Sequence, residues 1–113
     1  DWYPKLLKEA TGIAISQDEL FVIADRVYNL MRAFWIREFK DQWSQAVDYP
    51  PSRWFDEPLT EGPYKGAKLD REKYDEILQT YYRKRGWNPK GIPTKAILEK
   101  LNLGYVAQEL GLK

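Results

Sequence analysis

Apolar side chains recur at steps of three and four residues along the stretch that follows Ser16. They are Leu20, Ile23, Val27, Leu30, Met31 and Phe34. This spacing places them along one side of an α-helix. Ser16 and Glu19 also match the capping-box pattern S-x-x-E, in which each side chain accepts a hydrogen bond from a backbone N–H of the first turn. The pattern therefore predicts a helix over residues 17–39.

Shorter helical patterns occupy four other segments. Residues 2–12 end in Gly12, which suits the left-handed C-cap of a helix. Asp70 is the predicted N-cap of a third helix, which begins at this residue. Its apolar face consists of Tyr74, Ile77, Leu78, Tyr81 and Tyr82. We expect a short helix after Thr94 as N-cap, and a last amphipathic turn or two over residues 105–110.

The chain shows neither the strict alternation of a half-buried strand nor a two-residue hairpin signal. We therefore expect an all-α fold, a compact bundle of four to five helices that forms a single domain over residues 1–113. A long connection over about residues 40–68 contains four prolines and several large apolar side chains. Among the latter are Trp43, Tyr49, Trp54, Phe55 and Leu59. This composition indicates an ordered strap across the helices, and its length hints at a partner surface elsewhere.

The segment YYRKRGWNPKGIPT, residues 81–94, combines cations and aromatic residues and has two interpretations. It could bind a nucleic acid, or it could end one helix and begin the next. Each residue type has a local role: Gly86 suits the C′ position, Trp87 can fold back on the end of the helix, and Asn88–Gly91 matches a type I turn. We favour the local interpretation, and nucleic-acid binding is the less favoured alternative.

Composition narrows the possible chemistry. The 113 residues carry a formal charge of +1, which supplies no strong field for nucleic acid or an anionic membrane. The chain has no cysteine and no histidine, which removes thiolate nucleophiles, imidazole bases, disulfides and the usual ligands of zinc and iron–sulfur clusters. No apolar run approaches the ~18–20 residues needed to span a bilayer. We assign no catalytic, cofactor-binding or metal-binding residue, and we expect neither nucleic acid nor membrane as a partner.

Three arginines on the 17–39 helix are candidates for contacts with a neighbouring domain or an anion: Arg26, Arg32 and Arg37. Arg26 and Arg37 are eleven residues apart, close to three whole turns, and so share a face, whereas Arg32 lies some way round the helix. The alternative is ordinary surface pairing with Glu38 or Asp25. The carboxylates of Asp18, Glu19 and Asp25 could also be read as an acid–base set, but a charge preference at a helix N-terminus explains them better.

Three motifs in one order resemble the C-terminal domain of the tungsten-containing aldehyde ferredoxin oxidoreductase family. An ATG turn precedes the first motif, a helix that ends in the pattern R-x-x-NL-x-R-x-F-x-x-RE. The second is P-x-R-x-x-x-EPL-x-x-GP-x-KG, and the third is YY-x-x-RGW-[DN]-x-x-GIPT. The matching residues are Arg26, Asn29, Leu30, Arg32, Phe34, Arg37 and Glu38, then Pro51, Arg53, Glu57, Pro58, Leu59, Gly62, Pro63, Lys65 and Gly66, then Tyr81 through Thr94. Met31, Trp35 and Phe39 stand where the family usually has Glu, Asn and Gly, which indicates a divergent branch.

The resemblance implies a cytoplasmic parent enzyme that oxidises aldehydes to carboxylic acids and passes two electrons to ferredoxin. The reaction would take place at a tungsten ion held by two pterin dithiolenes, with a 4Fe–4S cluster nearby. The pterin and cluster motifs of the family are expected upstream of Asp1, so this chain would hold no cofactor and would be inactive alone. Its expected partners are the remaining domains of the parent.

The alternative is a stand-alone helical protein-interaction domain derived from the same family. Under either interpretation, some tryptophans of the chain should expose apolar surface that a partner would cover. The candidates are Trp2, Trp35, Trp43 and Trp54. We expect such a chain to self-associate when it is isolated.

Overall fold

The structure is a computed structural model that describes residues 2–112. The α-helices are α1 (Trp2–Thr11), α2 (Gln17–Phe39), α3 (Arg53–Asp56), α4 (Arg71–Arg85), α5 (Lys95–Lys100) and α6 (Gly104–Glu109). Two 3₁₀ helices, η1 (Lys40–Gln42) and η2 (Gln45–Asp48), lie between α2 and α3. Residues 2–112 contain no β-strand, and an isolated antiparallel bridge joins Trp87 to Pro93. The prediction of an all-α fold is confirmed.

The helix ends lie where the capping signals predict them. Ser16 and Glu19 form the predicted capping box, with the backbone N–H of Glu19 donating to Ser16 Oγ at 3.2 Å and that of Ser16 to Glu19 Oε2 at 2.7 Å. The Asp70 carboxylate accepts the N–H of Lys73 at the start of α4. Gly86 ends α4 with a φ of 71°, a left-handed conformation that glycine adopts without steric cost.

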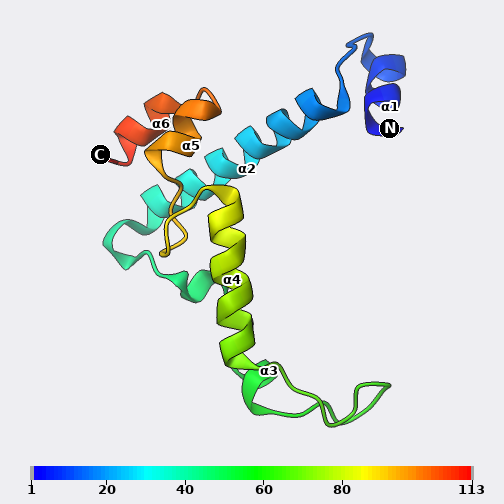
Figure 1. The fold of residues 1–113 in the computed structure, drawn as a ribbon, viewed down its shortest axis with the longest axis vertical. Helices are drawn as coiled ribbons and strands as arrows, with labels where there is room; N and C mark the ends of the chain where they lie inside the picture. The colour runs from blue at the N-terminus through cyan, green and yellow to red at the C-terminus, as the bar shows by residue number, and fades with distance from the viewer. Residues whose placement is uncertain (1, 113) are drawn as a thin grey trace.

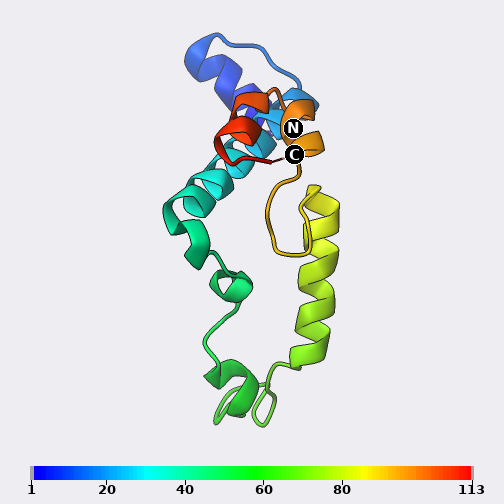
Figure 2. The ribbon, with the colours of Figure 1, turned by 90° about the vertical axis from the view of Figure 1, so that its left-hand side faces the viewer.

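The elements are spread along an elongated frame (Figure 1). Helices α5 and α6 lie beside the C-terminal half of α2, α4 leads away from that junction, and α1 projects from the N-terminal end of α2. In the view of Figure 2, the chain from η1 to α3 runs alongside α4, and a loop joins the two at their far end. The radius of gyration is 18.3 Å, whereas a compact domain of this length has a value of about 13 Å.

The buried side chains form two small clusters near the C-terminal half of α2. The first cluster consists of Ala33, Leu98, Leu101, Leu103, Val106 and Ala107, and it fixes α5 and α6 to α2. The second consists of Leu78, Tyr82 and Trp87, with Tyr49, Tyr74, Tyr81 and Ile97 packed against it, and it joins α4 to the connection. Trp87 does fold back on the end of α4, with its ring centroid 5.8 Å from Tyr81 and 5.9 Å from Tyr82.

The long connection is ordered, and part of it does cross the helices. The indole N–H of Trp43 donates to the Lys90 carbonyl at 3.1 Å, and Tyr49 and Phe55 both pack on Tyr74. Its two other aromatic residues, Trp54 and Tyr64, are exposed. The predicted strap is therefore attached at its beginning and middle, and its distal loop extends away from the body (Figure 2).

The apolar stripe that predicts α2 does not face the core of this chain. Ile23, Val27, Leu30, Met31 and Phe34 are between 43% and 56% exposed. The buried residues of α2 are instead Asn29, Ala33 and Ile36. Helix α2 is therefore apolar along two sides, and the described part of the chain packs against only one of them.

Leu98→Ala should lower the free energy of unfolding by about 2–5 kcal/mol, because it removes a completely buried side chain and leaves a cavity in the first cluster. The matched control is Ile77→Ala on α4, where the side chain is 69% exposed and the change should stay within about 0.5 kcal/mol. Urea unfolding followed by far-UV circular dichroism measures both. Equal losses in the two variants would contradict the assignment of the core.

Candidate functional site

Arg32 is the centre of a polar cluster that joins three distant parts of the chain. Its Nε donates to the Gly91 carbonyl at 2.8 Å, and its Nη1 donates to Asp48 Oδ1, also at 2.8 Å. Its Nη2 donates to the second oxygen of the same carboxylate, so the ion pair is bidentate. The guanidinium lies between two indole rings, 4.4 Å from the centroid of Trp43 and 4.6 Å from that of Trp87. Arginine is suited to this position because its planar group can stack and pair with a carboxylate at the same time.

Asp48 is held as a carboxylate by its neighbours. Burial alone raises the pKa of Asp48, but hydrogen bonds from Arg32 and Tyr82 outweigh burial and hold the pKa below its ordinary value of 3.8. Burial and the hydrogen bond to Asp48 in turn raise the pKa of Tyr82 far above its ordinary value, so the phenol stays protonated and donates to the carboxylate. The ion pair is mostly buried, with side-chain exposures of 11% for Arg32 and 22% for Asp48.

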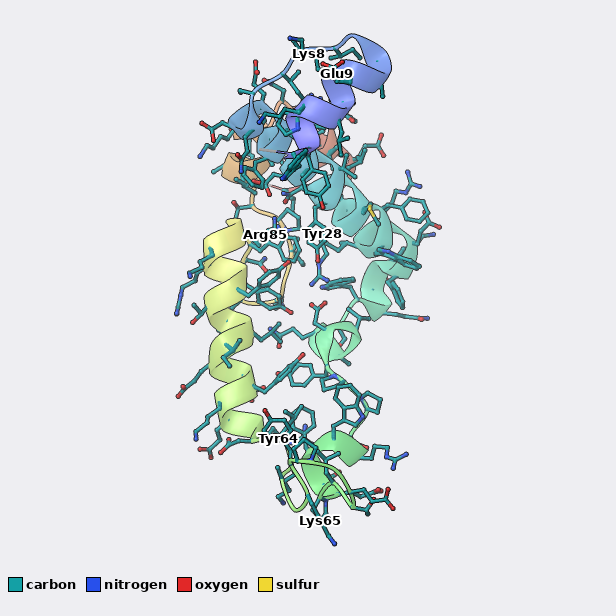
Figure 3. The ribbon with its side chains drawn as sticks, turned by 90° about the vertical axis from the view of Figure 1, so that its right-hand side faces the viewer. Lys8, Glu9, Tyr28, Tyr64, Lys65 and Arg85 are labelled. Carbon is teal, nitrogen blue, oxygen red and sulfur yellow. The ribbon has the colours of Figure 1, made fainter. Side chains whose placement is uncertain are left out.

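A second set of contacts extends the cluster toward the N-terminal half of α2. The indole N–H of Trp87 donates to Asn29 Oδ1 at 2.8 Å, and the amide of Asn29 donates to the Asp25 carbonyl. Tyr28 stacks on Trp87 with an interplanar angle of 9°. Arg85 covers Tyr28 and pairs with the Asp25 carboxylate at 2.7 Å, so the end of α4 is fixed to α2 (Figure 3).

Gly91 is required by the close approach of the Arg32 cluster. Its φ is +73°, and a Cβ at this position would lie 2.3 Å from Arg32 Nη2 and 2.8 Å from Tyr82 Cζ. Both the backbone conformation and the absence of a side chain are therefore needed here. The predicted turn is confirmed, since the Gly91 N–H donates to the Asn88 carbonyl at 2.9 Å.

The structure separates the three candidate arginines. Arg32 points inward, and its Nε, Nη1 and Nη2 all donate to groups of this chain. Arg37 pairs with Glu38 on the surface at 2.9 Å, the ordinary pairing considered above. Arg26 is exposed. The role of Arg26 and Arg37 as domain-interface or anion contacts stays a prediction.

Exposed apolar side chains are concentrated in three places. They are α1, the open side of α2 formed by the exposed stripe of Ile23, Val27, Leu30, Met31 and Phe34, and the distal loop between α3 and α4, residues 57–70. Trp2, Trp35 and Trp54 are more than half exposed, as expected, whereas Trp43 is partly covered by its contact with Arg32. The distal loop also borders a groove of about 540 Å³. Its main apolar lining residues are Trp54, Pro58, Leu59, Tyr64 and Leu69. Self-association through any of these surfaces stays a prediction.

Comparison with known proteins shows where this architecture occurs. The family model described as aldehyde ferredoxin oxidoreductase, domains 2 and 3, matches residues 1–103. The chain belongs to the aldehyde ferredoxin oxidoreductase family. The resemblance drawn from the sequence motifs is confirmed.

Individual relatives are much longer than this chain. The tungsten-containing aldehyde ferredoxin oxidoreductases of Pyrococcus horikoshii and Pyrococcus furiosus are each 33% identical over 103 residues, which is 91% of this chain and 16% of theirs. An aliphatic sulfonate oxidoreductase, WOR-like subunit, of Pyrococcus furiosus is 38% identical over 63 residues. Among solved structures, the active site complex BamBC of benzoyl coenzyme A reductase with 1,5-dienoyl-CoA has a TM-score of 0.70 at 34% identity. That match covers 95% of this chain and 14% of the other.

The chain does not supply the ligands of the iron–sulfur cluster that the family implies. A 4Fe–4S cluster is held by cysteine thiolates, and the chain has no cysteine. Residues 2–112 also contain no group of three or more acidic, cysteine or histidine side chains placed to hold a metal. Every buried side-chain nitrogen or oxygen in this part of the chain has a hydrogen-bond partner within it. No helix within the same range is long and apolar enough to cross a membrane.

Sequence reasoning did not find the hydrogen-bond partners that give Arg32 its structural role. Asp48 lies in the connection, sixteen residues from Arg32, and no local pattern joins the two. Asn29 could have indicated a buried polar contact, because it is a polar residue on the 17–39 helix that also stands in the first family motif. Several motif residues that carry the family resemblance, including Asn29, Arg32, Trp87 and Gly91, belong to this cluster.

Arg32→Lys should destabilise the chain by about 1–3 kcal/mol, because lysine cannot pair with both Asp48 oxygens and stack between two indoles at once. The matched control is Arg37→Lys on the same helix, where the exposed pair with Glu38 should change stability by less than about 0.5 kcal/mol. The midpoints of urea unfolding of the two variants give this comparison. An unchanged midpoint in Arg32→Lys would contradict the anchoring role.

Stability should also depend on pH through Asp48. Its pKa is lower in the folded chain than in the unfolded chain, so the unfolded chain takes up the proton first as the pH falls. The stabilisation is therefore complete well above pH 3.8 and is lost as the pH falls through the lowered value. Between about pH 5 and about pH 3, the urea midpoint of the unsubstituted chain should fall more steeply than that of Asp48→Asn. Parallel slopes would show that Asp48 is not linked to folding.

Proposed function

We propose that this chain is the helical, C-terminal structural part of a tungstopterin and iron–sulfur enzyme of the aldehyde ferredoxin oxidoreductase type. The parent enzyme would oxidise an aldehyde to a carboxylic acid in the cytoplasm and pass the electrons to ferredoxin. The chain itself supplies a wall for the neighbouring domains and is inactive alone. One observation carries this proposal: α2 is apolar along two sides, but only one of them packs against other described residues of this chain.

The comparisons support the same proposal. The chain spans about a sixth of the length of the aldehyde enzymes it matches, each of which is described as tungsten-containing. A helical piece with small clusters of buried residues and a large exposed apolar surface is typical of a segment that completes its core with other parts of a protein. The distal groove and α1 are further surfaces of this kind.

In a second candidate function, the chain has the same structural role but the parent enzyme catalyses a different reaction. The identity to the benzoyl coenzyme A reductase complex, 34%, equals that to the aldehyde enzymes within one percentage point. A parent that reduces an aromatic coenzyme A thioester is therefore the alternative enzyme. The stand-alone interaction domain is the non-enzymatic alternative, in which another protein would cover the same exposed surfaces.

The test is to purify from its native source the polypeptide that carries this sequence and to measure its intact mass, its tungsten and iron content, and its dye reduction. We expect a polypeptide several times larger than 13.4 kDa that contains both metals and reduces a viologen dye when an aldehyde is added. Benzoyl coenzyme A with a reduced dye tests the alternative enzyme in the same preparation. The recombinant 113-residue chain serves as the control and should bind neither metal.

Two results would contradict the proposal. A native polypeptide of 13.4 kDa without tungsten and iron would favour the stand-alone domain. Tungsten-dependent aldehyde oxidation by the recombinant chain alone would contradict its structural role.

A further inference from the structure

Lys40, the residue at the end of α2, has a backbone conformation that residues other than glycine rarely adopt. Its φ is 49° and its ψ is −126°. These angles are near those of the first central position in a type II′ turn, about +60° and about −120°, which glycine normally occupies. A residue with a Cβ is strained in such a conformation, so the surrounding structure must hold Lys40 in it.

The strain follows from a reversal of the chain directly after α2. Arg32 precedes Phe39, the last residue of α2, by about 10 Å along the helix axis at 1.5 Å per residue. Trp43 follows Phe39 by one short 3₁₀ turn, yet its ring centroid lies 4.4 Å from the Arg32 guanidinium. The chain must therefore turn back along α2 at once, and Lys40 makes this turn while its N–H still donates to the Ile36 carbonyl.

The segment after this turn is attached to the loop that precedes α5. We call residues 40–48 the latch. The indole N–H of Trp43 donates to the Lys90 carbonyl at 3.1 Å, and the side-chain amide of Gln45 donates to the Pro89 carbonyl. Both bonds join a side chain of the latch to a carbonyl of one short turn, so the first half of the latch is fixed at a single place.

Asp48 attaches the other end of the latch. Its carboxylate accepts hydrogen bonds from Arg32 and Tyr82, and its carbonyl accepts one from Tyr74 at 2.7 Å. Residues 40–48 contain no buried residue, and backbone N–H groups of the two 3₁₀ turns donate to carbonyls inside the latch. The latch is therefore a local unit that mainly side-chain contacts attach to the helices around it (Figure 2).

We propose that the latch is a strained element that opens as one unit about Lys40 while α2, α4 and α5 stay folded. Opening lets Lys40 return to a negative φ and releases the contacts of Trp43, Gln45 and Asp48 together. A segment with few buried apolar contacts opens at a lower free energy than the body of a protein. The opening uncovers Arg32, whose side chain is 11% exposed in the closed state, and the hollow of about 360 Å³ that the latch borders with α2. This inference does not depend on the reaction of the parent enzyme.

Lys40→Gly tests the strain. The measurement is hydrogen exchange of the latch amides, read by mass spectrometry of peptides from the native polypeptide that carries this sequence. Relief of the strain should slow exchange by about five- to a hundredfold, whereas the greater freedom of glycine in the open state should speed it by about two- to fivefold. The first effect is the larger, so exchange of the latch should slow severalfold.

Two variants serve as controls for this result. Lys40→Ala removes the charged side chain but keeps a Cβ, so exchange should stay near that of the unsubstituted protein. Asn102→Gly changes the other non-glycine residue with a positive φ among residues 2–112, at 57°, where asparagine is tolerated, and it should leave the latch unchanged. Equal slowing by Lys40→Gly and Lys40→Ala would overturn the proposal, and so would unchanged or faster exchange in Lys40→Gly.

Trp43→Ala tests whether the latch opens as a unit. Loss of the contacts of Trp43 should speed exchange severalfold in residues 45–48 as well as in residues 40–44, because both halves open together. Exchange in α5, which includes the buried Leu98, should not change and reports that the body stays folded. Faster exchange confined to residues 40–44 would overturn the proposal, as would an equal increase in α5.

Discussion

The bidentate pair between Arg32 and Asp48 is the contact on which the arrangement of this chain depends. It joins α2 to η2, and the bond from Arg32 to the Gly91 carbonyl adds the turn between α4 and α5. These three segments span 59 residues of sequence, and few buried apolar side chains lie between them. Breaking one partner of a mostly buried pair leaves the other without compensation, so the pair acts as a constraint on geometry more than as a source of surplus stability.

The same constraint explains why the chain can stay so open. The connection and α4 run side by side and are joined mainly by side chains. Tyr82 of α4 bonds Asp48 of the connection, and Tyr49 of the connection bonds Asp75 and packs on Tyr74 of α4. A frame of this kind buries little of its own apolar surface and leaves the outer side of α2 exposed. It is a shape suited to lying against other layers of a protein, in agreement with the proposed structural role.

The sequence predicted the features that are decided within a few residues. Capping at Ser16 and Asp70, the left-handed end at Gly86 and the turn at Asn88 each depend on neighbours no more than four residues away. The choice between the two sides of α2 was beyond such reasoning, because both are apolar and only tertiary contacts decide which one packs. The partners of Arg32 were hidden for the same reason, since the sequence separations are 16 to Asp48 and 59 to Gly91.

The motif residues of this segment carry information about architecture more than about chemistry. Asn29 and Arg32 in the first motif bond Trp87 and Gly91 in the third, so selection for one fold is sufficient to link the two motifs. A parent enzyme could change its substrate in other domains without disturbing these contacts. This accounts for the nearly equal identity, 33% and 34%, to enzymes described as an aldehyde oxidoreductase and as a coenzyme A thioester reductase. Differences in reaction within the family should accordingly be sought outside the Arg32 cluster.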